Sequence, residues 1–356
     1  MNRLKIEKFE MKYGYYLPSE YKSFLYKYGG DSQFGSCRFE YADGIVSNIL
    51  RQPGEMDFHL VPFGDIGNGD YYCFYRYGVG ESDYYIGIWL NETKNFVVLA
   101  SNFKSFMYKC MLDDYLSTLG VDENNNDTDI AAGISESLER CEVLSREYGF
   151  DLDMVRKMAN DKDYHNLMIK YDPNAVQSLC YIGKKLLSHG DEKGNDYLKR
   201  VMKIFPQYTA AYYIYGRPKL GFLLKPGKEL IQAIRSSLVT TGYSYWEEDY
   251  LEIPEDVHRE VLLYVDSLLE NEEGFLEKNL YSGRDPYDAD FRLECARQWA
   301  KNGNISKAIG EYSNALFCCE DSGAYKEVLS CALKDVKDAG IYYLEEIIQH
   351  DVRLLR

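Results

Sequence analysis

The spacing of hydrophobic residues predicts two helices at the start of the chain. In residues 18–28 they recur at i, i+3, i+4 and i+7, which forms one apolar stripe on a helix: Tyr21, Phe24, Leu25 and Tyr28. Pro18 favours a helix start, and Gly29 can end the helix with a positive φ. A preceding helix is expected over residues 2–13. We expect the stripe of the second helix to be core, so function should lie elsewhere.

Between residues 58 and 101 the pattern changes to short runs rich in aromatic and β-branched residues. Four such runs, separated by Gly, Asp and Asn, are typical of antiparallel strands: 58–63, 71–77, 84–90 and 95–101. A helix is predicted from about 102 to 119, because Ser101 or Asn102 can cap it and helical spacing returns. Residues 1–120 are therefore predicted to form an α+β domain with a mixed, largely antiparallel sheet and flanking helices.

The pattern breaks at residues 121–132, which we interpret as an acidic polar linker and the domain boundary. From 133 to 356 the spacing is helical almost throughout. Pro173 and Pro206 each follow a helix-like run and precede a glycine at the same distance, and residues 296–315 (ARQWAKNGNISKAIGEYSNA) resemble a tetratricopeptide repeat. We expect an all-α helical-repeat domain, irregular over 217–285. An irregular helical domain with chance spacings is the alternative.

Composition narrows the class of protein. A hydrophobic fraction of 46% is enough for packed cores. No run approaches the ~20 apolar residues of a membrane span, and charges throughout the opening residues argue against a signal peptide. Nine cysteines without a CxxC pair predict reduced, mostly buried thiols in a cytoplasmic protein and no structural zinc site.

The net charge of −16, from 41 basic and 57 acidic residues, bears on partners. It argues against direct binding of nucleic acid, whose phosphates attract basic proteins, and against anionic membranes. A basic protein partner stays possible, because opposite charges raise association rates. A charge that only keeps the protein in solution is the alternative.

Motifs that carry catalytic chemistry are missing from the sequence. It contains no P-loop, GxGxxG, HExxH or GxSxG motif, and its histidines are scattered singly. His59 falls inside a strand run, so we expect it to be structural. Asp65 and Asp70 could suggest a metal-dependent hydrolase, but GDIGNGD does not match a calcium loop and no nucleophile–base pair accompanies it. We expect no catalytic residue, cofactor or metal.

Acidic residues concentrate in the strand and loop part of the first domain. Residues 29–92 contain ten acids and three bases, whereas residues 1–28 carry a positive excess. We interpret the acids near the turns as candidate contacts for a basic protein partner: Asp31, Asp43, Asp57, Asp65, Asp70, Glu81 and Asp83. A solvated acidic face without a partner would have the same composition.

Three motifs in order carry a family resemblance. They are LPSEYKSFLYKYGG at 17–30, FGDIGNGDYYCF at 63–74 and SNFKSF at 101–106. This order resembles the SUKH superfamily, which groups the yeast cell-wall synthesis regulator with many bacterial immunity proteins. The resemblance covers about residues 1–120, and the helical remainder departs from the minimal family pattern.

The resemblance implies a non-catalytic α+β domain that binds and neutralises a cognate toxin, often a nuclease, by occluding its active site. We therefore expect a cytoplasmic immunity protein or antitoxin with a basic toxin as partner. The alternative is a regulatory scaffold whose helical repeats recruit signalling or envelope-synthesis proteins, because helical repeats present extended binding surfaces.

Overall fold

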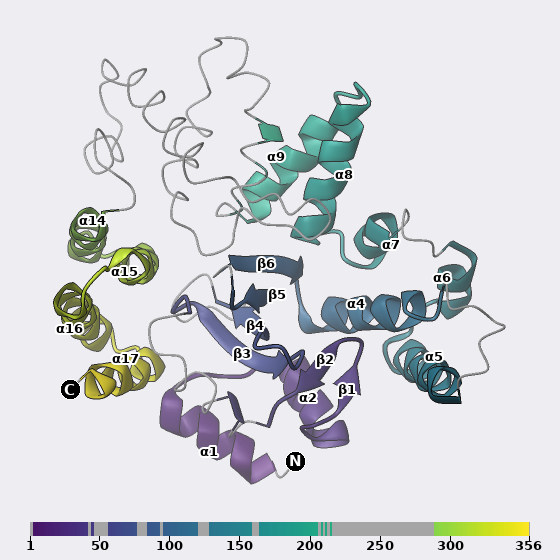
Figure 1. Cartoon of the computed structure of the whole chain (residues 1–356), viewed down its shortest axis with the longest axis horizontal. Helices are drawn as coiled ribbons and strands as arrows, with labels where there is room; N and C mark the ends of the chain where they lie inside the picture. Colours follow the sequence, from purple (N-terminus) through teal and green to yellow (C-terminus); the bar gives the residue numbers. More distant parts are fainter. Residues whose placement is uncertain are drawn as a thin grey trace.

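The structure is a computed structural model, and it describes residues 3–41, 44–45, 56–76, 84–92, 95–119, 128–158, 164–205, 208, 211, 214–215 and 288–355. The irregular repeats expected over 217–285 lie outside these residues, as does Pro206. An α+β part comes first and a helical part follows, which confirms the predicted fold class (Figure 1).

The two predicted N-terminal helices are present as α1 (Arg3–Tyr13) and α2 (Ser19–Tyr28). Pro18 occupies the N-cap position of α2, and the N–H of Gly29 donates to the Leu25 carbonyl at the other end. The φ of 78° at Gly29 needs a residue without a Cβ, which explains the glycine. Tyr21, Phe24 and Leu25 are buried, and Tyr28 packs partly buried against the same core, which confirms the prediction that this stripe is core.

Six strands form one antiparallel sheet in the order β1-β2-β3-β4-β5-β6. The four predicted strands are β3 (Leu60–Asp65), β4 (Tyr71–Tyr75), β5 (Tyr85–Leu90) and β6 (Asn95–Ala100). Two short strands, β1 (Gln33–Phe34) and β2 (Cys37–Phe39), were not predicted, because two or three residues are too few to show alternation. Every pairing among the described strands is antiparallel, so the parallel component of the expected mixed sheet is not found there.

One face of the sheet packs against α2 and α4 (Phe103–Leu116), and its core is aromatic. The rings of Phe63 and Phe74 stack with centroids 4.2 Å apart, and Tyr21 lies 5.3 Å from Phe103. The predicted cap is Asn102, whose side chain accepts from the Ser105 N–H and begins α4.

The other face of the sheet is covered by helices from the second half of the chain. They are α8 (Val176–Ser188) and α9 (Gly194–Ile204), which cover a second apolar cluster that includes the fully buried Trp89 (Figure 1). Phe205 packs edge-on against Tyr75 and Tyr85, with centroids 5.3 and 4.9 Å away. The helical part therefore completes the core of the α+β part.

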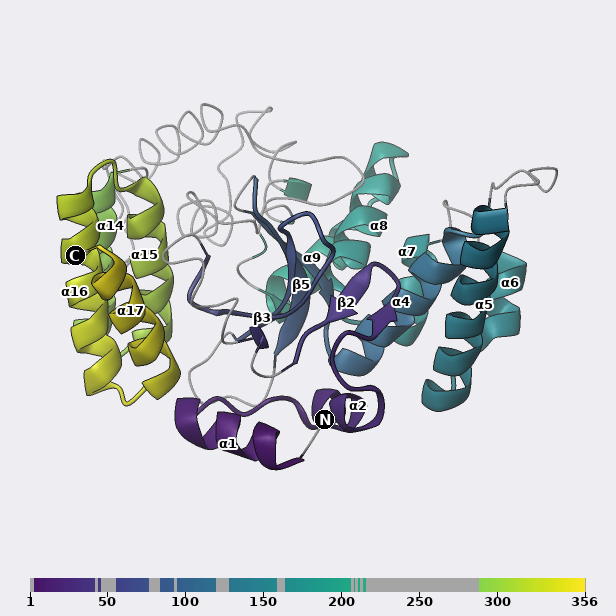
Figure 2. The same cartoon turned by 60° about the horizontal axis from the view of Figure 1, so that its bottom comes forward.

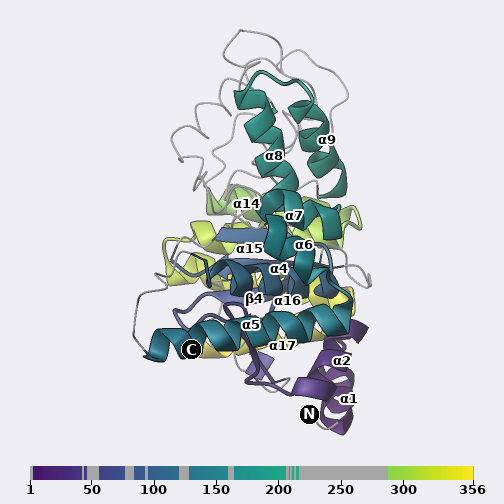
Figure 3. The ribbon, with the colours of Figure 1, turned by 90° about the vertical axis from the view of Figure 1, so that its right-hand side faces the viewer.

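Helices α5 (Thr128–Tyr148), α6 (Leu152–Met158) and α7 (Tyr164–Tyr171) join α4 to α8. Helix α5 begins inside the segment predicted to be a linker and packs along α4 (Figure 3). Two buried carboxylates fasten this group. Asp114 of α4 accepts from Arg140 of α5 at 2.6 Å, and Asp172 accepts from the Ser101 N–H and hydroxyl at 2.7 and 2.6 Å.

The C-terminal helices lie on the opposite side of the sheet from α5–α7 (Figure 2). They are α14 (Ala289–Lys301), α15 (Ile305–Cys318), α16 (Ser322–Asp338) and α17 (Tyr342–Leu354). The predicted repeat at 296–315 forms the hairpin α14–α15, which turns at Gly303 with φ 78°. Helix α15 is buried along most of its length, because it packs between α14, α16 and the segment before β3.

Candidate protein-binding surfaces

Asp57, a predicted partner contact, is buried at the junction of the α+β part and α15. Its carboxylate accepts from the backbone N–H of His59 and lies 2.8 Å from His59 Nδ1. The backbone N–H of Phe58, between Asp57 and His59, donates to Ser313 Oγ of α15 at 3.1 Å. Gly310 of α15 faces the His59 ring closely enough that a Cβ there would lie 3.5 Å from Cε1. Asp57 and His59 thus serve the internal junction.

Asp65 is mostly buried and forms an ion pair across the β2–β3 ladder. Arg38 reaches it with Nη2 at 3.0 and 3.1 Å from the two carboxylate oxygens, and Nε adds a third contact at 3.3 Å. Asp65, and more weakly Glu40 and Asp31, raise the pKa of the Arg38 guanidinium. The exposed charge at this place is the arginine, while the Asp65 side chain keeps about 10% of its surface.

Asp70 holds two hairpin turns together. One of its oxygens accepts from the side-chain amide of Asn68 in the β3–β4 turn, and the other accepts from the backbone N–H of Asn91 in the β5–β6 turn, at 2.9 and 2.8 Å. Gly67 and Gly69 have positive φ, which explains the glycines of the GDIGNGD motif. Asp65 and Asp70 are thus engaged by the protein's own groups, which leaves the hydrolase hypothesis without support from their geometry.

Asp31 differs from these three acids because it is exposed. Asp31 is the non-glycine residue with a positive φ, 61°, in the described part of the chain. Its N–H donates to the carbonyl oxygen of Phe39 in β2. Asp43, Glu81 and Asp83 lie outside the described residues. Of the four predicted contacts that the structure describes, Asp31 alone presents its carboxylate to solvent.

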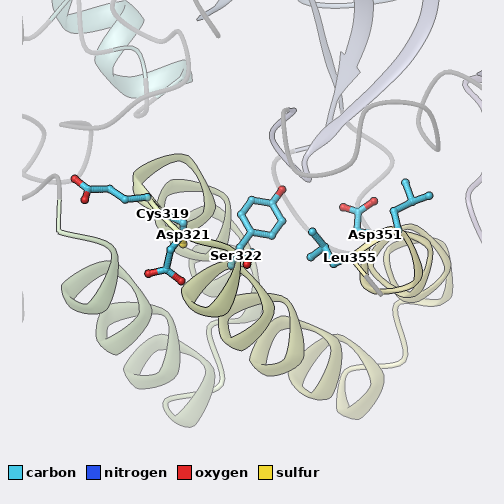
Figure 4. Close-up of a pocket in the computed structure, with 8 residues that line it drawn as sticks. Cys319, Asp321, Ser322, Asp351 and Leu355 are labelled. Atoms are coloured by element: carbon cyan, nitrogen blue, oxygen red, sulfur yellow. The ribbon is translucent and has the colours of Figure 1, made fainter.

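A pocket that sequence reasoning missed lies in the C-terminal helices (Figure 4). It has a volume of about 230 Å³ and is formed by the α15–α16 turn and the end of α17. Its walls combine apolar side chains with three carboxylates: Cys319, Glu320, Asp321, Ser322, Tyr325, Asp351, Leu354 and Leu355. Asp321 also caps α16 by accepting from the Gly323 and Ala324 N–H groups.

The helix ends at this pocket carry charges of both signs. Helices α15 and α17 end there with partial negative charge, and α16 begins there with partial positive charge, which Asp321 caps. Burial, with Asp321 and Asp290 nearby, raises the pKa of the Cys319 thiol to about 11, so the thiol stays protonated at neutral pH. The Asp321–Ser322–Gly323 sequence could have indicated a helix cap at this turn. Sequence alone could not place α17 beside it.

Several candidate reactive side chains among the described residues are buried. Six of the nine free cysteines are buried, and burial raises the pKa of thiols such as Cys37 and Cys73. Burial also lowers the pKa of His165 to about 4, where it meets Ser178 Oγ at 3.0 Å. In the ranges that the structure covers, no group of three His, Cys, Asp or Glu side chains could hold a metal ion.

The three motifs and the antiparallel sheet lie within the first 110 residues, and the aromatic α2–α4 face is complete by Leu116. Residues 3–109 match the model of the SMI1 / KNR4 family (SUKH-1). The SUKH domain was predicted from its three motifs, and the match confirms it. No curated protein and no solved structure matches the chain. Among the described helices, none is long and apolar enough to cross a membrane.

Proposed function

We propose that this protein is a non-catalytic immunity protein, or antitoxin, that binds a cognate bacterial toxin and occludes its active site. The match of residues 3–109 to the SUKH-1 family carries the proposal, because immunity proteins are a principal class in that superfamily. The proposed toxin is a basic protein, a nuclease in the simplest case. A partner of that charge complements a chain of net charge −16.

The architecture restricts where such a toxin could bind. Both faces of the SUKH sheet are covered, one by α2 and α4 and the other by α8 and α9. A partner must therefore meet the hairpin turns, the exposed helices or the loops. Asp31 is an exposed acid just before β1, so we propose it as a contact, together with Asp43, Glu81 and Asp83, which lie outside the described residues.

Co-expression with the toxin-like gene beside its own gene tests the proposal. The full chain should restore growth and co-purify with the toxin. Asp31→Asn removes one charge and tolerates the positive φ, so it should weaken binding several-fold and reduce its salt dependence. Glu139→Gln on α5 is the matched control, because Glu139 is also exposed. Absence of both rescue and co-purification would refute the proposal.

A regulatory scaffold is the second candidate, and the hairpins α14–α15 and α16–α17 favour it. These hairpins lie apart from α5–α9, so the SUKH domain has helical groups on two sides (Figure 1). Removing the SUKH domain is a poor test, because α8 and α9 would lose the sheet they cover. Substitutions at exposed positions of α16 in the full chain are the better test. If the protein is a scaffold, these substitutions should abolish partner binding. If it neutralises a toxin through the SUKH domain, neutralisation should persist.

A further inference from the structure

Three strongly exposed hydrophobic side chains gather where α1 ends. Met11 is 84% exposed, Tyr16 67% and Tyr342 65%, and these are the largest exposed fractions among the described large hydrophobic residues. Gly14 comes three residues after Met11 and two before Tyr16, and a Cβ on Gly14 would lie 3.5 Å from the Tyr342 ring. Single exposed hydrophobic residues are ordinary, but a contiguous group marks an interaction site.

Helix α1 extends this apolar surface. Its inner face buries Ile6 and Phe9, and the opposite face carries Leu4, which is 52% exposed and lies two turns before Met11. Residues at i and i+7 lie on one face of a helix, so Leu4 and Met11 form an apolar strip on the outside. Helix α17 adds Tyr342 at the end of the strip, because α1 and α17 are in contact (Figure 2).

The charge around this strip is positive. Lys5, Lys8 and Lys12 are exposed on α1, and Lys8 lies one turn before Met11. Lys12 donates to the Tyr13 hydroxyl and has Glu346 of α17 nearby. The two acids of α1 are both engaged. Glu7 is paired with Arg3 at 3.0 Å, and Glu10 is buried, where it accepts from the Leu17 N–H and from Lys22.

We propose that this α1 face, made of Leu4, Lys8, Met11, Lys12, Tyr16 and Tyr342, docks an acidic amphipathic helix of a partner protein. The apolar strip receives the partner's apolar side chains, and the lysines pair with its carboxylates at the rim, as in other interfaces with an apolar centre. Eleven residues of α1 span about 16 Å, which suits about three turns of a partner helix. This partner is acidic, so the site is separate from the proposed toxin contact.

A protein fits this face better than a membrane or a nucleic acid. The chain as a whole carries −16 and would be repelled by an anionic bilayer or by phosphates. A single helix can approach the α1 face closely, so the attraction stays local and the remaining charge is screened beyond about 10 Å at moderate salt.

The test uses the full chain and a fluorescent 18-residue peptide as probe. The peptide places Leu at i, i+3, i+4 and i+7 on one face and Glu and Ala on the other. The control peptides are a scrambled sequence and one with Lys in place of Glu. We expect the acidic helix to bind with an affinity that falls as salt rises. Met11→Ser, Tyr342→Ser and Lys8→Glu should each weaken it about tenfold.

Matched controls come from the same chain. Met158→Ser removes a methionine that is 42% exposed on α6, and Lys301→Glu reverses an exposed lysine on α14, so both should leave the affinity within about twofold. Thermal unfolding confirms that every variant is folded. The proposal is overturned if the scrambled or basic peptide binds equally well, or if the control variants lose as much as the α1-face variants. Binding of phosphatidylserine vesicles through Met11 and Lys8, without peptide binding, overturns it in favour of a membrane.

Discussion

Replacing Asp172 by alanine should destabilise both the sheet and the helices that follow it. Asp172 is 1% exposed at the turn between α7 and α8. Its carboxylate accepts from the Ser101 N–H at 2.7 Å, from the Ser101 hydroxyl at 2.6 Å and from the Asn174 N–H at 3.1 Å. Ser101 follows β6 directly, so one side chain joins segments 71 residues apart.

The expected loss of unfolding free energy follows from these three bonds. Hydrogen bonds to a charged group contribute about 1.5–3 kcal/mol each, and bonds made by one side chain are not additive, so we expect about 3–5 kcal/mol in total. Alanine also leaves the partly buried Ser101 N–H without its acceptor. Asp191→Ala is the control, because Asp191 is a partly exposed residue that accepts from Lys193 N at 3.0 Å, and it should cost less than about 1 kcal/mol.

Urea unfolding with hydrogen exchange measured segment by segment is the assay. Exchange in β5–β6 and in α7–α8 should accelerate together in Asp172→Ala, because these segments share one core. The reasoning is wrong if the variant loses less than about 1 kcal/mol, or if only α7–α8 exchanges faster while the sheet stays protected.

Three further predictions concern pH, backbone space and a buried ion pair. Burial lowers the pKa of His165 to about 4, so as the pH falls the unfolded chain takes up this proton before the folded chain does. The free energy of unfolding should therefore decrease below about pH 6.5, by about 1 kcal/mol at pH 5.5. A pH series on His165→Asn should lack this loss. Gly87→Ala should cost about 1–3 kcal/mol in urea unfolding, because a Cβ would meet the Val97 carbonyl oxygen of the neighbouring strand, whereas Gly133→Ala, in open space on α5, should stabilise by about 0.5–1 kcal/mol. Arg292→Ala should cost about 3–5 kcal/mol in thermal or urea unfolding, because it strips the buried pair with Glu311, and a double replacement by apolar residues should cost clearly less.

Long elements with a clear period could be predicted from the sequence, and short or nonlocal ones could not. The α2 stripe, the four longer strands and the Asn102 cap were all readable, because side-chain periodicity and capping act within a few residues. Strands β1 and β2 were not predicted, since their pairing partners are set by the sheet. The role of Asp70 was not predicted either, because its acceptor oxygens meet Asn68 and Asn91 only after two hairpins fold side by side.

The candidate acids show the same limit. Sequence composition identified an acid-rich region, but it could not distinguish an acid that faces solvent from one that fastens the fold. Asp31 is exposed, while Asp57, Asp65 and Asp70 are bound by the protein's own donors. The pocket at the end of α17 was also invisible, because its walls come from residues 319–325 and 351–355.

The sequence by itself determined the SUKH domain, its aromatic core face and the helical character of the described part of the remainder, since each depends on local spacing and on motifs in order. Tertiary structure decided that α8 and α9 close the second face of the sheet, and that α17 lies against α1 and brings Tyr342 beside Gly14. The physical reason is that these arrangements bury apolar surface between segments far apart in the chain. Burial of this kind depends on which faces meet, and periodicity within one segment does not specify its partner.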